Sequence, residues 1–161
     1  MFYRRHLCGG EKRGRRVGPT MRGKGTKLMA VADAHGLRIA VHAGSASPHK
    51  VTLVQDTVAQ GFTVASPERL IGDKAYDRDP LDIALAEIGI QLIAPHKVNR
   101  IALPTRDRRA LRRYRRRWKV ERLFAWLQNL RRILIRVDYH PENYLGFVRL
   151  GCILILLGRY L

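Results

Sequence analysis

Residues 111–136 (LRRYRRRWKVERLFAWLQNLRRILIR) constrain the fold of this chain most, because they contain neither Gly nor Pro and are dense in Leu, Arg and Lys. Pro104 and Pro141 lie on either side of the stretch, so one long helix is its most favourable conformation. Four leucines recur at the four-three-four spacing of a single helix face, and we expect that face to be buried. The leucines are Leu123, Leu127, Leu130 and Leu134, and the aromatic residues Trp118, Phe124 and Trp126 would anchor the same helix.

Glu121 is the only acidic residue in this stretch, which carries ten basic residues. A single carboxylate in so positive a segment has two interpretations. It forms an ordinary ion pair with Arg117 one helical turn earlier, or it is a metal ligand in a site that acts on phosphodiesters while the arginines hold DNA. The stretch by itself leaves both interpretations open.

The remaining sequence predicts alternating strands and helices. Residues 1–27 are rich in Gly, Arg and Lys and lack a hydrophobic period, which indicates an exposed basic arm or loop. Two apolar runs, 28–36 and 37–44, are typical of an antiparallel hairpin with its turn near 33–36. We then expect a helix over 48–60, a strand over 69–72, a helix over 80–88, a strand over 90–96, a polar loop over 98–105 and a final apolar helix. This order indicates an α/β fold with a mixed sheet and flanking helices.

Asp73 directly follows the apolar run 69–72, so a buried strand would deliver this acid at its carboxyl end. The alternative is an ordinary turn or cap residue. The segment between Asp73 and Glu121 is long enough for the late helix to fold back over the sheet and bring the two acids together. Two carboxylates in a basic cleft offer the oxygen ligands that Mg²⁺ prefers, with Mn²⁺ as a substitute.

The charge of the chain indicates an anionic partner. Lys and Arg number 31 against 13 Asp and Glu, a net charge of +18. Such an excess weakens a compact fold by self-repulsion unless an anion binds, and nucleic acid is the usual anion. A membrane surface is the competing partner. The final segment is apolar, but Arg149 interrupts it and the run 150–157 is shorter than the roughly 20 residues that span a bilayer, which favours a buried helix and no membrane.

Cys8 and Cys152 form no zinc or disulfide pattern, and the first ten residues lack the apolar run of a secretory signal. A cytoplasmic location fits these features best.

Three runs of residues stand out in order along the chain: RGKGTKLMAVADAHGL at 22–37, GDKAYD at 72–77 and RWKVERLFAWLQNLRR at 117–132. Together they resemble the DDE-type transposases of small bacterial insertion sequences, and the similarity extends from about Gly18 to the carboxyl terminus. The resemblance implies a ribonuclease-H-like fold and Mg²⁺-dependent cutting and joining of double-stranded DNA at element ends and target. It assigns the second catalytic acid of the family to Asp73 and the catalytic glutamate to Glu121, both as metal ligands.

The family glutamate lies in a Tyr-x-x-Arg-x-x-x-Glu signature, which Tyr114 and Arg117 complete here. The signature ends with Lys or Arg seven residues after the glutamate. This position is Gln128 here, so Arg131 and Arg132 would have to replace it. We expect DNA contacts from Tyr114, Arg117, Lys119, Arg131, Arg132, Lys24 and Lys27.

The first catalytic Asp of the family lies on a strand before the Gly- and Lys-rich loop, whereas this chain has no Asp before Asp33. We therefore expect a truncated sheet without its first strand, with residues 28–161 forming a partial catalytic domain behind the arm at 1–27. Asp33, in a predicted turn, is a poor substitute. The chain would be weak or inactive alone and would act as a homodimer or with an upstream transposase segment. A non-catalytic basic nucleic-acid-binding module and a non-functional remnant are the alternatives.

Overall fold

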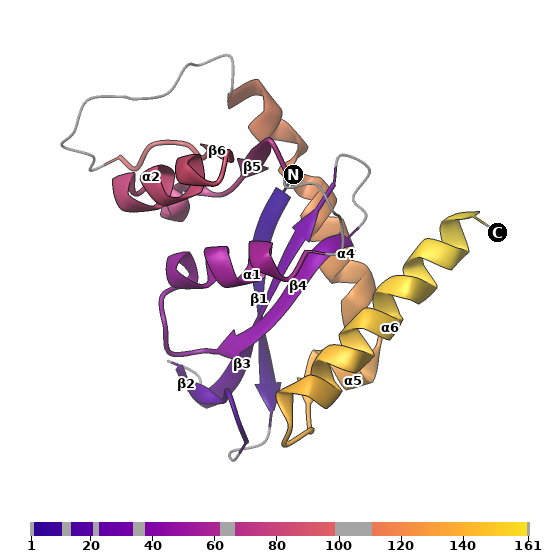
Figure 1. Ribbon diagram of the computed structural model, residues 1–161. Helices are drawn as coiled ribbons and strands as arrows, with labels where there is room; N and C mark the ends of the chain where they lie inside the picture. The colour runs from indigo at the N-terminus through magenta and orange to yellow at the C-terminus, as the bar shows by residue number, and fades with distance from the viewer. Residues whose placement is uncertain are drawn as a thin grey trace.

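The computed structural model describes residues 2–10, 14–20, 23–33, 38–61, 67–98 and 111–160. Within these ranges, seven strands form one mixed sheet with helices on both faces (Figure 1). The strands are β1 (Phe2–Gly10), β2 (Gly18–Thr20), β3 (Gly23–Ala32), β4 (Arg38–Ser45), β5 (Arg69–Ile71), β6 (Gln91–Ile93) and β7 (Ile135–Arg136). The helices are η1 (Lys50–Leu53), α1 (Val54–Ala59), η2 (Lys74–Tyr76), α2 (Asp79–Glu87), η3 (Arg112–Arg117), α4 (Trp118–Gln128), α5 (Arg131–Leu134) and α6 (Pro141–Tyr160).

β1 lies at the centre of the sheet. It pairs antiparallel with β3, from Phe2 opposite Ala32 to Gly9 opposite Gly25, and β3 pairs antiparallel with β4. On its other side β1 runs parallel to β5, which pairs in parallel with β6. The short strand β2 pairs with β3, and the short strand β7 pairs with β1. The sheet therefore combines an antiparallel half with a parallel half, as expected for a mixed sheet.

The predicted irregular arm over residues 1–27 and the missing first strand are both wrong. β1, β2 and the beginning of β3 occupy this region, and β1 separates β3 from β5. The sequence of this region is basic and rich in glycine and has no hydrophobic period, so no local pattern predicts these strands, although each pairs with a neighbouring strand in the fold. The predicted hairpin is confirmed as β3 and β4, and the turn predicted near 33–36 lies outside the described residues except for Asp33.

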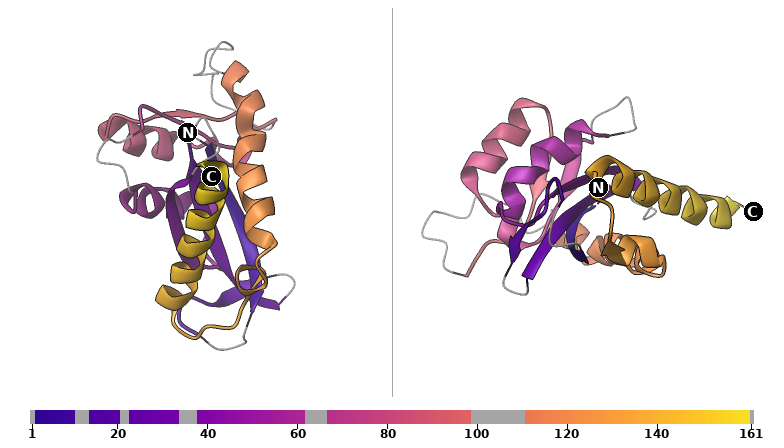
Figure 2. Two further views of the ribbon diagram at one scale, coloured as in Figure 1. Left: turned by 90° about the vertical axis from the view of Figure 1, so that its right-hand side faces the viewer. Right: turned by 90° about the horizontal axis from the view of Figure 1, so that it is seen from below.

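Alternate residues of β3 face two separate cores. Leu28, Ala30 and Ala32 pack with residues of α4, α5 and α6, whereas Met29 and Val31 pack with residues of α1, η2 and α2. Figure 2 shows the strands between these two groups of helices. Because both faces are covered, this part of β3 reads as a continuous apolar run instead of an alternating one.

The predicted long helix over 111–136 is broken. η3 and α4 form its first part, but Leu130 is extended (φ −90°, ψ 106°) and a short α5 leads into β7, which pairs with the end of β1. Leu123 and Leu127 are buried as predicted, whereas Leu134 is 42% exposed. Trp118 is half exposed and does not anchor the helix. The pairing of β7 with β1 takes the chain out of the helix, and the predicted apolar stripe ends there.

α6 buries one face and exposes the other. Tyr144, Val148 and Cys152 are buried in the core, whereas Leu154 and Leu157 are about half exposed. The stretch Pro141–Gly158 is long and apolar enough to cross a membrane, and 28% of it is buried. The sequence expectation of a shorter apolar run therefore underestimated this helix. It packs against α5 and β4 on one side, so the predicted buried helix is covered on that face only.

The remaining predicted elements are present at the expected places. α2 corresponds to the helix predicted over 80–88, and β5 and β6 to the strands predicted over 69–72 and 90–96. The helix predicted over 48–60 begins as η1 and continues as α1. The loop predicted over 98–105 lies outside the described residues except for Val98.

Four strand termini meet at one end of the sheet. Phe2 at the beginning of β1 lies opposite both Ala32 and Ile71, and Ile71 lies opposite Ile93. We call this end the Asp73 end, because Asp73 follows β5 there. Arg136 lies opposite Gly10 at the other end, the Arg136 end. The length of β1 separates the two ends by about 27 Å.

Candidate active site

The side chain of Asp73 is oriented by the backbone of the turn that follows it, at the Asp73 end of the sheet. Its conformation is extended (φ −77°, ψ 172°), and its Oδ1 accepts a hydrogen bond from the amide of Ala75 at 2.8 Å, which caps η2. A Cβ on Gly72 would lie 2.8 Å from Cδ2 of the buried Tyr76 ring, so the close approach of strand and ring requires glycine. Asp73 therefore has the cap role that the sequence left open as an alternative.

Lys50 approaches the same carboxylate from η1. Its Nζ lies 2.5 Å from Oδ2 of Asp73 and 4.7 Å from the centre of the Tyr76 ring. The residue is buried, with 8% of its surface exposed. Asp73 thus accepts an amide on one oxygen and an ammonium on the other.

Arg117 is the ion-pair partner of Glu121. Its Nη2 lies 3.1 Å from Oε1 of Glu121, and its guanidinium lies 5.0 Å from the centre of the Tyr114 ring. η3, which carries Arg117, contacts β5, and the charge of Arg117 acts on Asp73. The ordinary ion pair considered for Glu121 is therefore present, and the charge of Arg117 is the smallest of the effects that lower the pKa of Asp73.

The surroundings of Asp73 favour its ionised form. Burial acts to raise the pKa of the carboxyl, but the hydrogen bonds from Lys50 and Ala75, with the charges of Lys50 and Arg117, outweigh burial. The pKa of Asp73 is lower than its ordinary value as a result.

We expect Asp73→Asn to remove part of the acid dependence of stability. Because the folded pKa lies below the unfolded value of about 3.9, the ionised carboxylate stabilises the fold above that value, and this contribution is lost as the pH falls through the folded pKa. The wild type should exceed Asp73→Asn in free energy of unfolding at about pH 7, and the difference should shrink below about pH 4. Urea unfolding at a series of pH values measures both. A difference that stays constant over this range would contradict the expectation.

The side chains as they stand do not fit the predicted Mg²⁺ or Mn²⁺ site. Among the described residues, no group of three or more His, Cys, Asp or Glu side chains is placed to hold a metal ion. Asp73 and Glu121 are paired with Lys50 and Arg117, so the four charges cancel. A divalent cation needs carboxylate oxygens with an excess of negative charge. Each acid is paired with its own cation, so the two acids do not present a ready metal centre.

The residues predicted to contact DNA lie in two groups. One group belongs to η3 and the first turn of α4, near the Asp73 end, and contains Tyr114, Arg117 and Lys119. The other lies toward the Arg136 end, where Lys24 pairs with Pro19 and where α5 directly precedes β7; it contains Lys24, Arg131 and Arg132. The exposed arginines Arg112, Arg113, Arg115 and Arg116 extend the first group along η3.

Lys27 is buried, although the sequence predicts that it contacts DNA. Only 4% of its surface is exposed, and its ammonium donates a hydrogen bond to the carbonyl of Pro48. Lys27 shares its face of β3 with Met29 and Val31, which helix α1 covers, so the side chain meets protein instead of solvent. This burial argues against the predicted contact of Lys27 with a phosphate.

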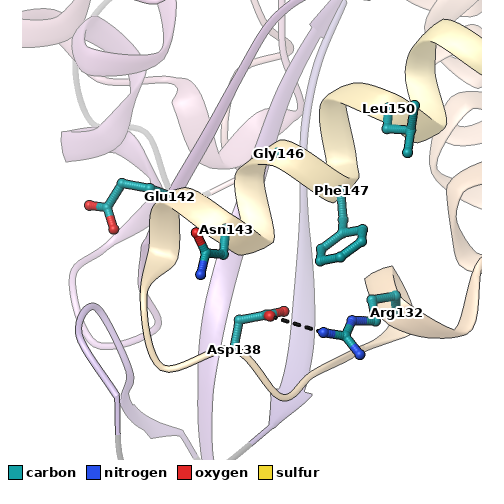
Figure 3. A pocket seen from close by; sticks show the side chains of 7 residues that line it. All are labelled: Arg132, Asp138, Glu142, Asn143, Gly146, Phe147 and Leu150. Carbon is teal, nitrogen blue, oxygen red and sulfur yellow. Dashed lines mark hydrogen bonds and ion pairs between the residues drawn. The ribbon is translucent and has the colours of Figure 1, made fainter.

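Arg132 folds against α6 beside a shallow hollow (Figure 3). Its Nη2 lies 3.3 Å from Oδ1 of Asp138, and its guanidinium lies 4.8 Å from the centre of the Phe147 ring. About half of the side chain remains exposed. A phosphate would have to compete with Asp138 for this arginine, unlike the open arginines of η3.

Two charged contacts near Asp73 are not predicted by the sequence pattern. Lys50 falls within a predicted helix, and the only signal for its partner is that a cation in the first turn of a helix opposes the helix dipole. Asp77 of the GDKAYD run is buried, and its carboxylate contacts Nδ1 of His96 at 3.1 Å and the amide of Lys97 at 2.8 Å. These bonds fix the loop after β6 beside η2.

The fold and the site define a strongly basic α/β protein in which Asp73 forms an ion pair with Lys50 and Glu121 forms one with Arg117. The chain belongs to the transposase DDE domain family, whose model matches residues 6–156, and the resemblance inferred from the sequence is confirmed. It is 31% identical over 147 residues to a transposase for insertion sequence element IS402 of Burkholderia cepacia, which covers 85% of this chain and 65% of that protein. It is 34% identical over 139 residues to a transposase for insertion sequence element IS6501 of Brucella ovis, covering 82% of this chain and 98% of that protein. No solved structure is significantly similar to the chain.

Proposed function

We propose that this chain is an insertion-sequence transposase protein with a ribonuclease-H-like fold, which binds double-stranded DNA at element ends and target in the cytoplasm. Family membership and the two relatives support transposition as its process. The sheet supports the fold, since the antiparallel strands β4, β3 and β1 continue into the parallel strands β5 and β6 between two layers of helices. The net charge of +18 supports DNA as the partner, with a second copy or an upstream transposase segment completing the assembly.

One observation carries the assignment of Asp73 and Glu121 as the family acids. Asp73 follows β5 and Glu121 lies on α4, and Arg117, which pairs with Glu121, also contributes a small electrostatic effect at Asp73. Tyr114 packs beside the same guanidinium, so the members of the family signature form one cluster. The exposed arginines of η3 adjoin the cluster and would hold the DNA backbone next to the two acids.

DNA affinity should fall steeply with salt, because each neutralised phosphate releases counterions. We expect the double variant Arg113→Gln/Arg116→Gln, which removes two exposed charges of η3, to reduce the slope of log affinity against log salt by about 2. Fluorescence anisotropy with a labelled duplex measures the slope.

The matched control is Arg69→Gln/Arg149→Gln, which removes the same charge from β5 and α6. It should change the slope much less. Equal effects of the two double variants would show that binding follows net charge alone and would contradict an η3 interface.

We expect this chain alone to nick end-sequence DNA slowly or not at all in Mg²⁺ or Mn²⁺. The proposal assigns two acids to the site, whereas two-metal phosphoryl transfer normally uses at least one more, and no group of three possible metal ligands is found among the described residues. Asp33 follows β3 at the Asp73 end and is the acid to test first. A strand-nicking assay of the wild type and Asp33→Asn tests this expectation. Robust cleavage that Asp33→Asn abolishes would show that Asp33 completes the site.

A non-catalytic DNA-binding module is the second candidate. The observation that favours it is that each acid already has a structural partner, Lys50 for Asp73 and Arg117 for Glu121. In that case Glu121→Gln should leave DNA binding unchanged, and nicking should be absent from the wild type under every metal condition.

A further inference from the structure

The placement of Lys50 is unfavourable for its own helix. It is the first residue of η1, directly after the capping residue His49, whose Nδ1 accepts the amide of Val51 at 3.4 Å. A cation at this end of a helix is unfavourable, because the helix dipole places a partial positive charge there. The side chain is nevertheless buried, so a partner outside the helix must compensate for the charge.

Asp73 is that partner, and the Lys50 ammonium contacts both its carboxylate and an aromatic ring. The ammonium lies 2.5 Å from Oδ2 and faces the Tyr76 ring at 4.7 Å, an arrangement that adds a cation–π contact to the ion pair. Tyr76 is buried and packs against Gly72, which precedes Asp73. The same turn, η2, therefore supplies the Ala75 amide that orients the Asp73 carboxylate and the Tyr76 ring that faces the Lys50 ammonium.

A divalent cation at Asp73 would meet this ammonium. Oδ1 is engaged by the Ala75 amide, and Oδ2 is engaged by Lys50. Arg117 holds the second acid in the same way. Repulsion between an ammonium and a divalent ion sharing one carboxylate is large at such short range in a partly buried site.

We propose that the Lys50 ammonium is a resident cation that occupies Asp73 in place of a divalent metal, so that this chain binds metal weakly. The proposal rests on the proposed function, in which Asp73 is an acid of the family site. It explains why a chain from a family that generally depends on divalent metal has a charge-balanced pair at this position.

Binding of Mn²⁺ to the full chain tests the proposal, because free Mn²⁺ gives an electron paramagnetic resonance signal that the bound ion loses. Lys50→Gln should bind Mn²⁺ at least about tenfold more tightly than the wild type, since the competing charge is gone. Lys74→Gln is the matched control: it removes an exposed lysine one residue after Asp73 and should leave the affinity nearly unchanged. The double variant Lys50→Gln/Asp73→Asn should lose the gain.

Equal affinities of Lys50→Gln and the wild type would overturn the proposal, as would a gain that persists in the double variant. If Lys50→Gln does not unfold cooperatively, Lys50→Met, which keeps the aliphatic stem, replaces it in the same comparison. The Mn²⁺ affinity of the wild type is a further test of the proposal. Micromolar affinity that Asp73→Asn removes would refute a resident cation at Asp73. DNA binding is measured in parallel, so failure of the proposed function appears as lost DNA affinity and is separate from the metal result.

Discussion

Replacing Arg136 with Met should lower the free energy of unfolding by at least about 3 kcal/mol, the largest effect that we expect of any single substitution. Arg136 is 2% exposed, yet it carries a full charge. A buried charge is tolerated only when its hydrogen-bonding groups are satisfied. The structure satisfies it with four hydrogen bonds at the Arg136 end of the sheet.

These bonds join segments that are far apart in the sequence. Nη1 donates to Oγ1 of Thr26 at 2.5 Å, and Nη2 donates to the carbonyls of Arg15 and Tyr139 at 2.7 and 3.0 Å. Nε donates to the carbonyl of Asp138 at 3.0 Å. Methionine fills much of the space but leaves these acceptors without their donor, so the desolvation cost remains.

Urea unfolding of the purified chain measures the loss. Arg131→Met is the control, because this neighbouring arginine is exposed and should change stability by no more than about 0.5 kcal/mol. Arg136→Lys should also be strongly destabilised, since an ammonium cannot reproduce the planar fork of donors. A loss below about 1 kcal/mol in Arg136→Met would contradict the role assigned to this side chain.

Leu127→Ala should cost about 2–5 kcal/mol, the second large effect. Leu127 is fully buried where α4 meets α6, and its Cδ2 lies 3.2 Å from the position that a Cβ on Gly151 would occupy. Gly151 allows α6 to approach this closely. Truncation to Ala leaves a cavity at the contact, which two helices fixed to the same sheet cannot close completely.

Leu134→Ala is the matched control for this prediction. Both leucines belong to the apolar stripe that the sequence predicts, but Leu134 is 42% exposed. Its truncation should cost clearly less than that of Leu127, and thermal unfolding of both variants makes the comparison. Equal losses would mean that the helix continues past Leu130 with its stripe buried, contrary to the structure.

The sequence alone determined the elements whose signals are local. The apolar runs of β3 and β4, the short run that delivers Asp73 and the helical period around Leu123 and Leu127 each lie within a few residues, and the structure confirms these elements. The resemblance to a transposase family also depends on short runs, and it is confirmed. Such features are readable because neighbouring residues create them.

The tertiary structure alone decided the features whose cause lies elsewhere in the chain. β1 is a strand because β3 and β5 pair with it on both sides, although its own sequence is basic and rich in glycine. The long helix breaks at Leu130 because β7 joins the end of β1 and Arg136 is drawn to acceptors up to 121 residues away. Lys50 and Asp73, separated by 23 residues, form their ion pair only because the fold brings the side chain from η1 to the turn that follows β5. Hydrogen bonds and ion pairs between distant segments outweigh local propensity at these positions, and a linear pattern does not contain their partners.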